Sequence, residues 1–246
     1  MSGRPLQVVA VVLAGGLGTR IQHLVPGLPK PMVPVAGRPF LEWVVRYLVK
    51  QGIRKVIISS GYLAETIERH FQNSMIQNVA IACIAEHTPL GTGGGLRHVA
   101  RLSSERPDAW LVLNGDTLAF ADLGKVISVL NTPEQAGVII GREVSDTSRY
   151  GTMVVGSAGE LLGFAEKRPG KGLINAGIYL LKDSVVREFP DRVPLSLEAD
   201  VFPQLVERKI PLKVCVIDTP FLDIGTPESL QRAQSFVQAN RAQFAE

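Results

Sequence analysis

The sequence predicts an α/β fold with an open, mostly parallel, mixed central sheet, and three observations support this. The run at 6–13 is apolar and rich in β-branched residues, which is typical of a parallel strand buried on both faces. Strand and helix signals then alternate to about residue 114. From about residue 136 the pattern becomes rich in strands. We expect a single domain over 1–246, in which the part from about 136 folds over the same sheet.

The remaining elements follow in order along the chain. After the first strand, apolar residues between 40 and 48 recur at helical spacing, and Pro39 suits the first turn of that helix. Further strands are expected at 55–59, 79–85 and 110–113, with helices at 63–71 and 93–102. The later strands are expected at 137–140, 150–155, 161–165 and 174–181, and a last helix starts near Thr226. In such sheets ligands bind beyond the carboxyl ends of the strands, so we expect functional residues there.

A loop with three glycines follows the first predicted strand. Gly15, Gly16 and Gly18 carry no Cβ, so backbone N–H groups can approach a bound anion. Arg20 and Lys30 follow and add the positive charges that a polyphosphate needs. The loop therefore indicates a site for a nucleoside triphosphate. The alternative is that these glycines only form a tight turn between strand and helix.

Two common phosphate-binding signatures do not fit this loop. The dinucleotide fingerprint G-x-G-x-x-G needs a glycine at position 21, where the chain has Ile21. The P-loop needs a Lys-Ser or Lys-Thr pair after Gly18, where Thr19 and Arg20 stand. The loop is therefore of another type.

Composition excludes several classes of partner. Hydrophobic residues make up 46% of the chain and charged residues 20%, which is typical of a globular protein. The net charge of +3, without a run of Lys and Arg, gives no indication of nucleic-acid binding. No stretch approaches the ~20 apolar residues of a membrane span. Cys83 and Cys215 lie in apolar, strand-like runs and are expected to be buried free thiols. We expect a cytoplasmic protein, and the pattern leaves a homo-oligomer open.

Two aspartates each follow a short apolar run. Asp116 ends the segment Asn114-Gly115-Asp116, and Asp223 follows Phe221-Leu222. A lone aspartate at such a place is often a turn former or helix cap. Two carboxylates at strand ends can instead share Mg²⁺, which takes one or two carboxylates together with phosphate oxygens and water. The serine, cysteine and histidine residues form no pattern that indicates nucleophilic catalysis.

These motifs together are similar to those of a known family. Leu13-Ala14-Gly15-Gly16-x-Gly18-Thr19-Arg20 and Pro29-Lys30-Pro31-Met32 resemble the signature of the sugar-1-phosphate nucleotidyltransferases, or NDP-sugar pyrophosphorylases. The resemblance runs from about residue 6 to about residue 235. It implies a Rossmann-like, three-layer fold of the nucleotide-diphospho-sugar transferase type. It also implies a nucleotide-binding half at about 1–135 and a sugar-phosphate-binding half at about 136–246.

The resemblance implies a role for each matching residue. The nucleotide would be bound by Leu13, Ala14, Gly15, Gly16, Gly18, Thr19, Glu86, Gly91 and Thr92. The catalytic residues would be Arg20, Lys30, Asp116 and Lys167, with Mg²⁺ on Asp116 and Asp223. The sugar 1-phosphate would be bound by Gly115, Tyr150, Gly151, Glu166, Lys167 and Asn175. Without the other motifs, Glu166 and Lys167 would be interpreted as an exposed charge pair, and Tyr150 as ordinary strand packing.

The reaction implied is attack of a sugar-1-phosphate oxygen on the α-phosphorus of the nucleotide, with pyrophosphate leaving. The nucleophile is already an anion, so alignment and charge neutralisation matter more than a base. Mg²⁺ on Asp116 and Asp223 would bridge the reacting phosphates. Arg20 and Lys30 would stabilise the leaving pyrophosphate.

The choice of base is indicated by Glu86. A carboxylate can accept hydrogen bonds from N1–H and the exocyclic amine of guanine together, which favours GTP if Glu86 faces the base. A solvated side chain at a strand end is the alternative. Within the family, the segments around Lys30, Gly91, Asp116 and Asp223 are most similar to guanylyltransferases that use a heptose 1-phosphate. A uridylyl- or thymidylyltransferase acting on a hexose or amino-sugar 1-phosphate, and a non-catalytic nucleotide-sugar sensor, stay open.

Overall fold

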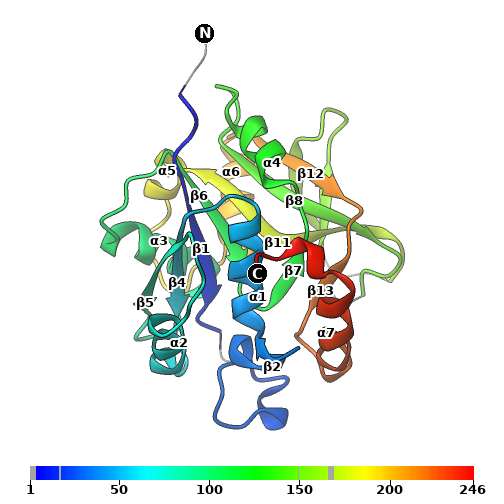
Figure 1. The fold of residues 1–246 in the computed structure, drawn as a ribbon. Helices are drawn as coiled ribbons and strands as arrows, with labels where there is room; N and C mark the ends of the chain where they lie inside the picture. The colour runs from blue at the N-terminus through cyan, green and yellow to red at the C-terminus, as the bar shows by residue number, and fades with distance from the viewer. Residues whose placement is uncertain (1–3, 17, 149, 166–168) are drawn as a thin grey trace.

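The computed structural model describes residues 4–16, 18–148, 150–165 and 169–246. Over these ranges it contains a nine-stranded mixed sheet (Figure 1). Strand β1 (Val8–Ala14) lies between β6 (Ala109–Asn114) and β4 (Lys55–Ser60), and β5 (Ala80–Ala85) lies beyond β4. These four strands are parallel. The predicted α/β fold with a mostly parallel central sheet is confirmed.

The strands between residues 137 and 217 join this same sheet. β11 (Gly172–Lys182) runs antiparallel to β6 on one side and to β8 (Gly137–Val144) on the other. β12 (Leu212–Ile217) lies parallel to β8. β9 (Thr152–Val155) meets β11 at one pair of residues and pairs with β10 (Leu161–Ala165).

Alternation along β1 divides the core into two clusters, one on each face of the sheet. Ala10 and Val12 belong to one cluster, whereas Val9 and Val11 belong to the other, because successive side chains of a strand point to opposite faces. Four helices cover the first face: α1 (Phe40–Lys50), α2 (Ala64–Gln72), α4 (Leu123–Leu130) and α7 (Pro227–Ala239). Three cover the second: α3 (Gly91–Leu102), α5 (Asp183–Arg187) and α6 (Phe202–Glu207). The result is the expected three-layer arrangement.

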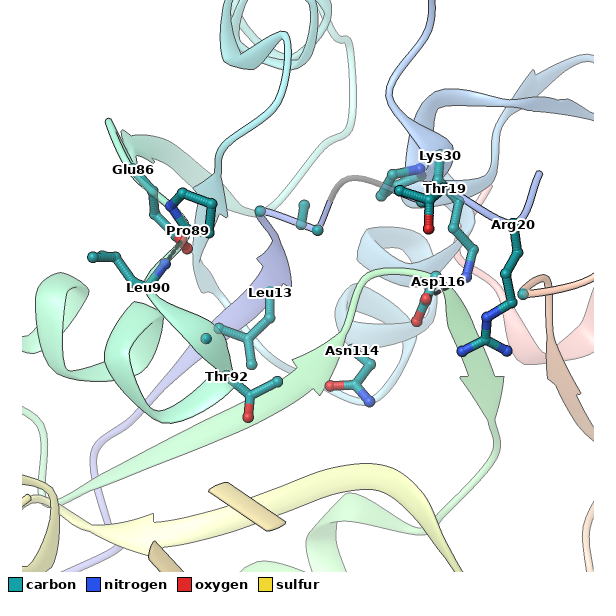
Figure 2. Close-up of a pocket in the computed structure, with 17 residues that line it drawn as sticks. Leu13, Thr19, Arg20, Lys30, Glu86, Pro89, Leu90, Thr92, Asn114 and Asp116 are labelled. Atoms are coloured by element: carbon teal, nitrogen blue, oxygen red, sulfur yellow. Dashed lines mark hydrogen bonds and ion pairs between the residues drawn. The ribbon is translucent and has the colours of Figure 1, made fainter. Parts of the chain in front are cut away.

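The register of β1 and β6 determines where the functional residues meet. Leu13 of β1 is the neighbour of Asn114 of β6, so the carboxyl ends of both strands lie at one edge of the sheet (Figure 2). Glu86 follows β5 at the same edge, and its backbone N–H donates to Ser60 O at the end of β4 (2.6 Å). Residues far apart in the sequence are thereby collected at this edge.

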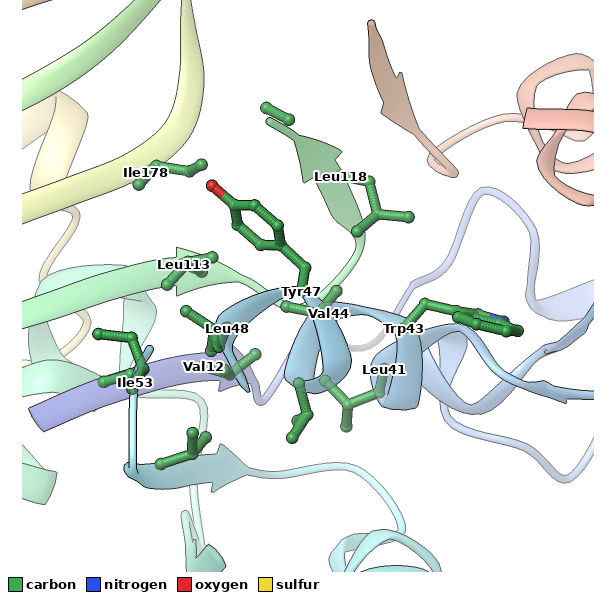
Figure 3. Close-up of a cluster of buried hydrophobic side chains, with 14 of the residues drawn as sticks. Val12, Leu41, Trp43, Val44, Tyr47, Leu48, Ile53, Leu113, Leu118 and Ile178 are labelled. Carbon is green, nitrogen blue, oxygen red and sulfur yellow. The ribbon is translucent and has the colours of Figure 1, made fainter. Parts of the chain in front are cut away.

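Helix α1 packs against the strands that end at this edge. Its apolar side chains pack on residues of β1, β6 and β11 (Figure 3). Trp43 and Tyr47 are almost fully buried, and burial of each large side chain contributes on the order of 1.5–3 kcal/mol. The hydroxyl of Tyr47 donates to Ala121 O (2.8 Å) and accepts from Ala121 N (3.0 Å). These bonds satisfy the polar end of an otherwise apolar side chain.

The structure extends the sequence prediction at several places. Some boundaries shift by a few residues; β1 begins at residue 8 and α3 at residue 91. Helices α4, α5 and α6 were not predicted. Two small sheets were also not predicted: β2 (Pro34–Val35) with β3 (Arg38–Pro39), and β7 (Thr117–Ala119) with β13 (Phe221–Asp223). Short 3-10 segments cover Gln22–Leu24, Lys30–Met32 and Arg241–Gln243, and a π-helical turn covers Leu197–Val201.

Both cysteines are free thiols, as predicted, but each is half-buried rather than buried. Cys83 lies on β5, the outer strand of the parallel part of the sheet, and Cys215 lies on the outer strand β12. Within the described part of the chain, no helix has both the length and the apolar character needed to cross a bilayer.

Candidate active site

A cavity of about 540 Å³ opens at the carboxyl ends of β1 and β6 (Figure 2). All residues predicted for the nucleotide line it: Leu13, Ala14, Gly15, Gly16, Gly18, Thr19, Glu86, Gly91 and Thr92. Of the predicted catalytic residues, Arg20, Lys30 and Asp116 line it as well. Five further lining residues were not singled out from the sequence: Pro31, Pro89, Leu90, Asn114 and Gly225. The residues predicted from separate motifs therefore line one cavity.

The glycine loop after β1 is shaped by close approaches. A Cβ on Gly15 would stand 2.8 Å from Glu86 Oε1, and one on Gly18 would stand 2.6 Å from Lys30 Cβ. Gly18 also has φ +62°, a conformation that side chains rarely adopt. A larger residue at either position would separate the loop from Glu86 or Lys30. The glycines thus bring the loop close to both ends of the cavity.

One end of the cavity combines a lysine with two aspartates. Lys30 Nζ donates to Asp116 Oδ2 (2.5 Å) and lies 3.8 Å from Asp223 Oδ1. Pairing of β7 with β13 places Thr117 opposite Asp223, and Ile224 N donates to Asp116 O (3.0 Å). The backbone therefore brings the two carboxylates together around one cationic group.

This donor set fits Mg²⁺. Because Asp116 and Asp223 each present an oxygen to the same ammonium group, the two carboxylates face a common point. Mg²⁺ is usually held by one or two carboxylates, with phosphate oxygens and water completing its shell. Among the residues that the structure describes, no group of three or more His, Cys, Asp or Glu is arranged to hold a metal ion.

Arg20 lies at the same end of the cavity. Figure 2 shows it on the side of Lys30 and Asp116, away from Glu86. Its side chain and that of Thr19 are exposed. Arg20 and Lys30 together place two positive charges beside the glycine loop, which suits phosphate groups.

Glu86 lies at the opposite end of the cavity. Its Oε1 accepts from Ser59 Oγ (2.7 Å) and its Oε2 from Leu90 N (3.3 Å). Burial raises the pKa of Glu86, and the two hydrogen bonds partly oppose this shift. Each carboxylate oxygen can accept a further hydrogen bond, so Glu86 keeps accepting capacity towards the cavity.

Of the residues predicted for the sugar phosphate, those that the structure describes do not line this cavity, and two lie outside the described residues. Gly115 N donates to Leu13 O (2.8 Å), directly beside the cavity. Tyr150 packs edge-on against Phe221, with ring centroids 6.1 Å apart. Neither of these, nor Gly151 or Asn175, lines the cavity. The predicted residues Glu166 and Lys167 lie outside the residues that the structure describes.

Two polar residues near the site were missed by sequence reasoning. Glu198 accepts hydrogen bonds from Thr92 Oγ1 (3.0 Å) and from the hydroxyl of Tyr179 (2.7 Å). Tyr179 in turn accepts from Asn175 Nδ2 (2.6 Å). Glu198 lies 106 residues from Thr92, and no local pattern marks it. Asn114 was quoted only as part of a motif, yet its side chain lines the cavity, and its buried Oδ1 has no hydrogen-bond partner among the residues that the structure describes.

Comparison with known proteins agrees with this geometry. The family model for nucleotidyl transferases matches residues 9–240. A D-glycero-alpha-D-manno-heptose 1-phosphate guanylyltransferase from Campylobacter jejuni is 38% identical over 89% of this chain and 95% of its own length. One from Aneurinibacillus thermoaerophilus is 33% identical over 93% of this chain and 98% of its own length.

A solved structure of another protein has a similar fold. The crystal structure of HddC from Yersinia pseudotuberculosis superimposes with a TM-score of 0.81 at 32% identity, covering 94% of this chain and 99% of that one. The same protein complexed with GMP-PN superimposes with a TM-score of 0.80. A family model that matches most of the chain, and relatives that match over most of both chains with the same fold, establish the family. The chain therefore belongs to the nucleotidyl transferase family and is a sugar-1-phosphate nucleotidyltransferase.

Proposed function

We propose that the protein transfers GMP from GTP to D-glycero-α-D-manno-heptose 1-phosphate, giving a GDP-heptose and pyrophosphate. Two relatives with this activity in their names match the chain over nearly its whole length. The Yersinia protein, whose complex with GMP-PN was solved, has the same fold. These relatives support the guanine base and the heptose.

One observation carries the proposal: a single cavity has different chemistry at its two ends. Arg20, Lys30 and Asp116 lie at one end and Glu86 lies at the other (Figure 2). A nucleoside triphosphate has the same polarity, with an anionic chain at one end and a hydrogen-bonding base at the other. The triphosphate would lie along the glycine loop, with the base towards Glu86.

The transfer step takes place at the end of the cavity that contains Arg20, Lys30 and Asp116. An oxygen of the sugar phosphate attacks the α-phosphorus of GTP, and the bond from the α-phosphorus to the bridging oxygen breaks with its electrons leaving on pyrophosphate. Arg20 and Lys30 hold the departing phosphates and neutralise charge that develops there. Lys30 also ties the 3-10 turn Lys30–Met32 to Asp116, which fixes its ammonium group at the loop. No general base is needed, because the attacking oxygen is already ionised.

Asp116 and Asp223 would hold Mg²⁺. When bound, the ion would reduce charge repulsion between the reacting phosphates and hold them in line. The 2.6 Å hydrogen bond from Gly225 N to Asp223 Oδ1 orients this carboxylate. The hydroxyl of Thr117 donates to Asp116 Oδ1 (3.2 Å), while Asp116 Oδ2 accepts from Lys30 Nζ.

The acceptor would bind on the other side of Asp116. In this proposal, Gly115, Tyr150, Gly151, Glu166, Lys167 and Asn175 contact the sugar phosphate, with Lys167 on its phosphate group. Asn175 is connected to the cavity through Gly177, because a Cβ on Gly177 would stand only 2.8 Å from Asn114 Nδ2. The acceptor side is thereby continuous with the nucleotide side.

A substrate panel tests the proposal. GTP, UTP, dTTP, CTP and ATP are each combined with heptose, mannose, glucose and N-acetylglucosamine 1-phosphates and Mg²⁺, and pyrophosphate release is measured. We expect the highest kcat/KM for GTP with D-glycero-α-D-manno-heptose 1-phosphate. A preference for UTP or dTTP would replace the guanylyltransferase proposal with a uridylyl- or thymidylyltransferase. Binding of nucleotide without pyrophosphate release from any pair would indicate a sensor.

A further inference from the structure

Three hydroxyl groups and one carboxylate form a compact network between the helices α3 and α6. Glu198 Oε2 accepts from Thr92 Oγ1 (3.0 Å) and Ser196 Oγ (3.0 Å), and Oε1 accepts from the hydroxyl of Tyr179 (2.7 Å). The reaction as described above uses neither Glu198 nor Tyr179. Neither lines the cavity, so neither is placed to touch a nucleotide there.

The carboxylate determines the direction of the hydrogen bonds beyond it. An ionised carboxylate only accepts, so Tyr179 must donate its single proton to Glu198 and can only accept from Asn175. Asn175 Nδ2 donates to Tyr179 at 2.6 Å, and Asn175 Oδ1 accepts from Gly177 N at 2.9 Å. Which end of the amide faces Tyr179 is thereby fixed. These two hydrogen bonds use one of the two N–H groups of Asn175 and one lone pair of its oxygen.

Tyr179 is suited to this relay because it stays protonated. Its side chain is 0% exposed, and burial, with Glu198 beside it, raises the pKa of its hydroxyl well above the usual value. A phenol that keeps its proton always has one to donate. Its hydroxyl therefore has a proton to donate to Glu198.

A second set of hydrogen bonds connects Glu198 to the start of α3. The hydroxyl of Thr92 accepts from Leu197 N (2.8 Å) while it donates to Glu198, so its only proton is used within the protein. Leu195 O accepts from Gly93 N (2.9 Å) and Gly94 N (3.1 Å) close by. These contacts fix the start of α3, where Leu90, Gly91 and Thr92 line the cavity.

We propose that Glu198 is a positioning residue with two arms: through Tyr179 it orients the amide of Asn175 for the sugar phosphate, and through Thr92 it holds the start of α3 against the nucleotide. The first arm rests on the acceptor role of Asn175 in the proposed function. The second arm rests on the cavity alone. Glu198 thus joins the two substrate sides through one carboxylate.

Steady-state kinetics of three variants separate the arms. Tyr179→Phe removes the link to Asn175 and should raise KM for the sugar phosphate roughly tenfold, as loss of one hydrogen bond of about 1.4 kcal/mol implies, with KM for the nucleotide within about twofold. Thr92→Val should instead raise KM for the nucleotide roughly tenfold and leave KM for the sugar phosphate within about twofold. Glu198→Gln should raise both KM values. An amide can donate as well as accept, so it does not fix the direction of the hydrogen bonds in the two arms. Thr92→Ser keeps the hydroxyl and should restore most of the affinity lost in Thr92→Val.

The controls distinguish this inference from simple loss of fold. Glu188→Gln changes an exposed carboxylate that pairs with Arg208, and both KM values should match the wild type. The double variant Tyr179→Phe with Asn175→Ala should have the sugar-phosphate KM of Asn175→Ala alone, because Tyr179 acts through Asn175. Additive effects in the double variant, or unchanged KM values in Glu198→Gln, would overturn the proposal. If Glu198→Gln does not fold, the double variant still decides the first arm.

A signal independent of turnover separates this inference from the proposed function. The substrate pair is whichever one the wild type uses best, so a wrong heptose or base assignment shows in the wild type and not in the comparison. The side-chain amide resonances of Asn175, identified by their loss in Asn175→Ala, should shift in Tyr179→Phe and in Glu198→Gln, and not in Glu188→Gln. Resonances that stay unchanged in Glu198→Gln would overturn the positioning role whatever the enzyme turns over.

Discussion

At the scale of single residues, the site depends on charges that the fold brings together from distant segments. Lys30 meets Asp116 across 86 positions of sequence, and Asp223 joins them through the pairing of β7 and β13. The glycine loop and the two aspartates were predicted because each follows an apolar strand and stands in a recognisable motif. Glu198 was not predicted, because its role depends only on partners such as Thr92 that are remote in sequence.

The two aspartates give the first prediction. Asp116→Asn and Asp223→Asn each replace a negative charge by a neutral amide, which weakens both the hold on a cation and the placement of Lys30. Loss of one such contact typically lowers kcat by ~10²–10³-fold, and we expect that loss in each variant. Initial rates at saturating Mg²⁺ and substrates measure it. Asp218→Asn, at an exposed position on the same segment, is the control. Near-normal turnover in either variant would remove that residue from the metal site.

Glu86 gives the second prediction. If its carboxylate accepts from guanine, Glu86→Gln loses ~1–3 kcal/mol of base recognition, so kcat/KM for GTP should fall by roughly one to two decades and the preference for GTP over UTP should narrow. Competition between the two nucleotides in one reaction measures this. Glu65→Gln, an exposed glutamate of α2, is the control.

The pH dependence of the same variant checks the mechanism. Burial raises the pKa of Glu86, so the carboxylate becomes protonated at a higher pH than an exposed one would. A protonated carboxyl group cannot accept the paired hydrogen bonds of guanine. In the wild type, kcat/KM for GTP should therefore fall as the pH decreases through this raised pKa, and Glu86→Gln should lack that fall. An unchanged preference for GTP in the variant would move base recognition to the backbone of the loop.

At the scale of elements, helix α1 carries a charged cluster on the side that faces α2. Glu42 Oε1 accepts from Arg38 (2.6 Å) and Arg46 (2.8 Å), and Oε2 lies 2.9 Å from His70 Nε2 of α2. Glu42 is 5% exposed. Burial alone would raise the pKa of Glu42, but the hydrogen bonds and charges of Arg46 and Arg38 outweigh it and lower the pKa below its usual value. The cluster ties α1 to α2 and to the β2–β3 hairpin.

Glu42→Gln is the third prediction. Removing one partner of a buried ion pair costs about 3–5 kcal/mol, so the free energy of unfolding should fall by about that amount at neutral pH. Since the folded-state pKa of Glu42 is lowered, its contribution is present above 4.5 and is lost as the pH falls through the folded value. The difference between variant and wild type should therefore shrink in acid. Urea titrations at several pH values measure it, with exposed Glu134→Gln as the control. A difference independent of pH would contradict the ion-pair account.

The elements differ in how well sequence predicts them. Helix α1 was predicted because its apolar residues recur at helical spacing over three turns. Helix α4 was not, because Val126, Ile127 and Val129 are β-branched and resemble a strand; its N-cap is Asp122, whose side chain accepts from Lys125 N (3.1 Å). Packing of α4 on β8 and β11 overrides the local preference. The small sheets consist of two- and three-residue strands, which are too short to leave a periodic pattern.

At the scale of the whole molecule, the last residues of the chain close the layer that begins with α1. Phe244 is 4% exposed and packs edge-on against Trp43 of α1 (5.1 Å between centroids) and against Phe120 (5.7 Å). Ala245 N donates to Arg46 O (3.1 Å), and Arg46 Nη1 donates to Ala245 O (3.1 Å). Phe244 therefore belongs to the core cluster that α1 forms with the sheet, and Ala245 packs against it.

Phe244→Ala is the fourth prediction. Truncation of this buried phenylalanine leaves a cavity beside the rings of Trp43 and Phe120, and such changes cost about 3–5 kcal/mol. Thermal unfolding should show a clearly lower Tm, whereas Met75→Ala, at a side chain that is 92% exposed, should leave Tm unchanged. The two variants together separate burial from loss of a large apolar side chain. Equal Tm values for the two would contradict the core role of Phe244.

Strand β11 has a consequence for how the molecule can be divided. Tyr179 pairs with Val112 of β6 on one side and with Ile139 of β8 on the other, so β11 completes the sheet of the earlier part of the chain and begins that of the later part. A gene split between residues 135 and 136 would give an N-terminal fragment in which the apolar strand β6 has a bare edge. Neither product should fold alone, and mixing both during refolding should be required to recover activity. The parts of the chain before and after residue 136 therefore share one sheet, and neither is expected to serve as an independent module that could be transferred to another protein.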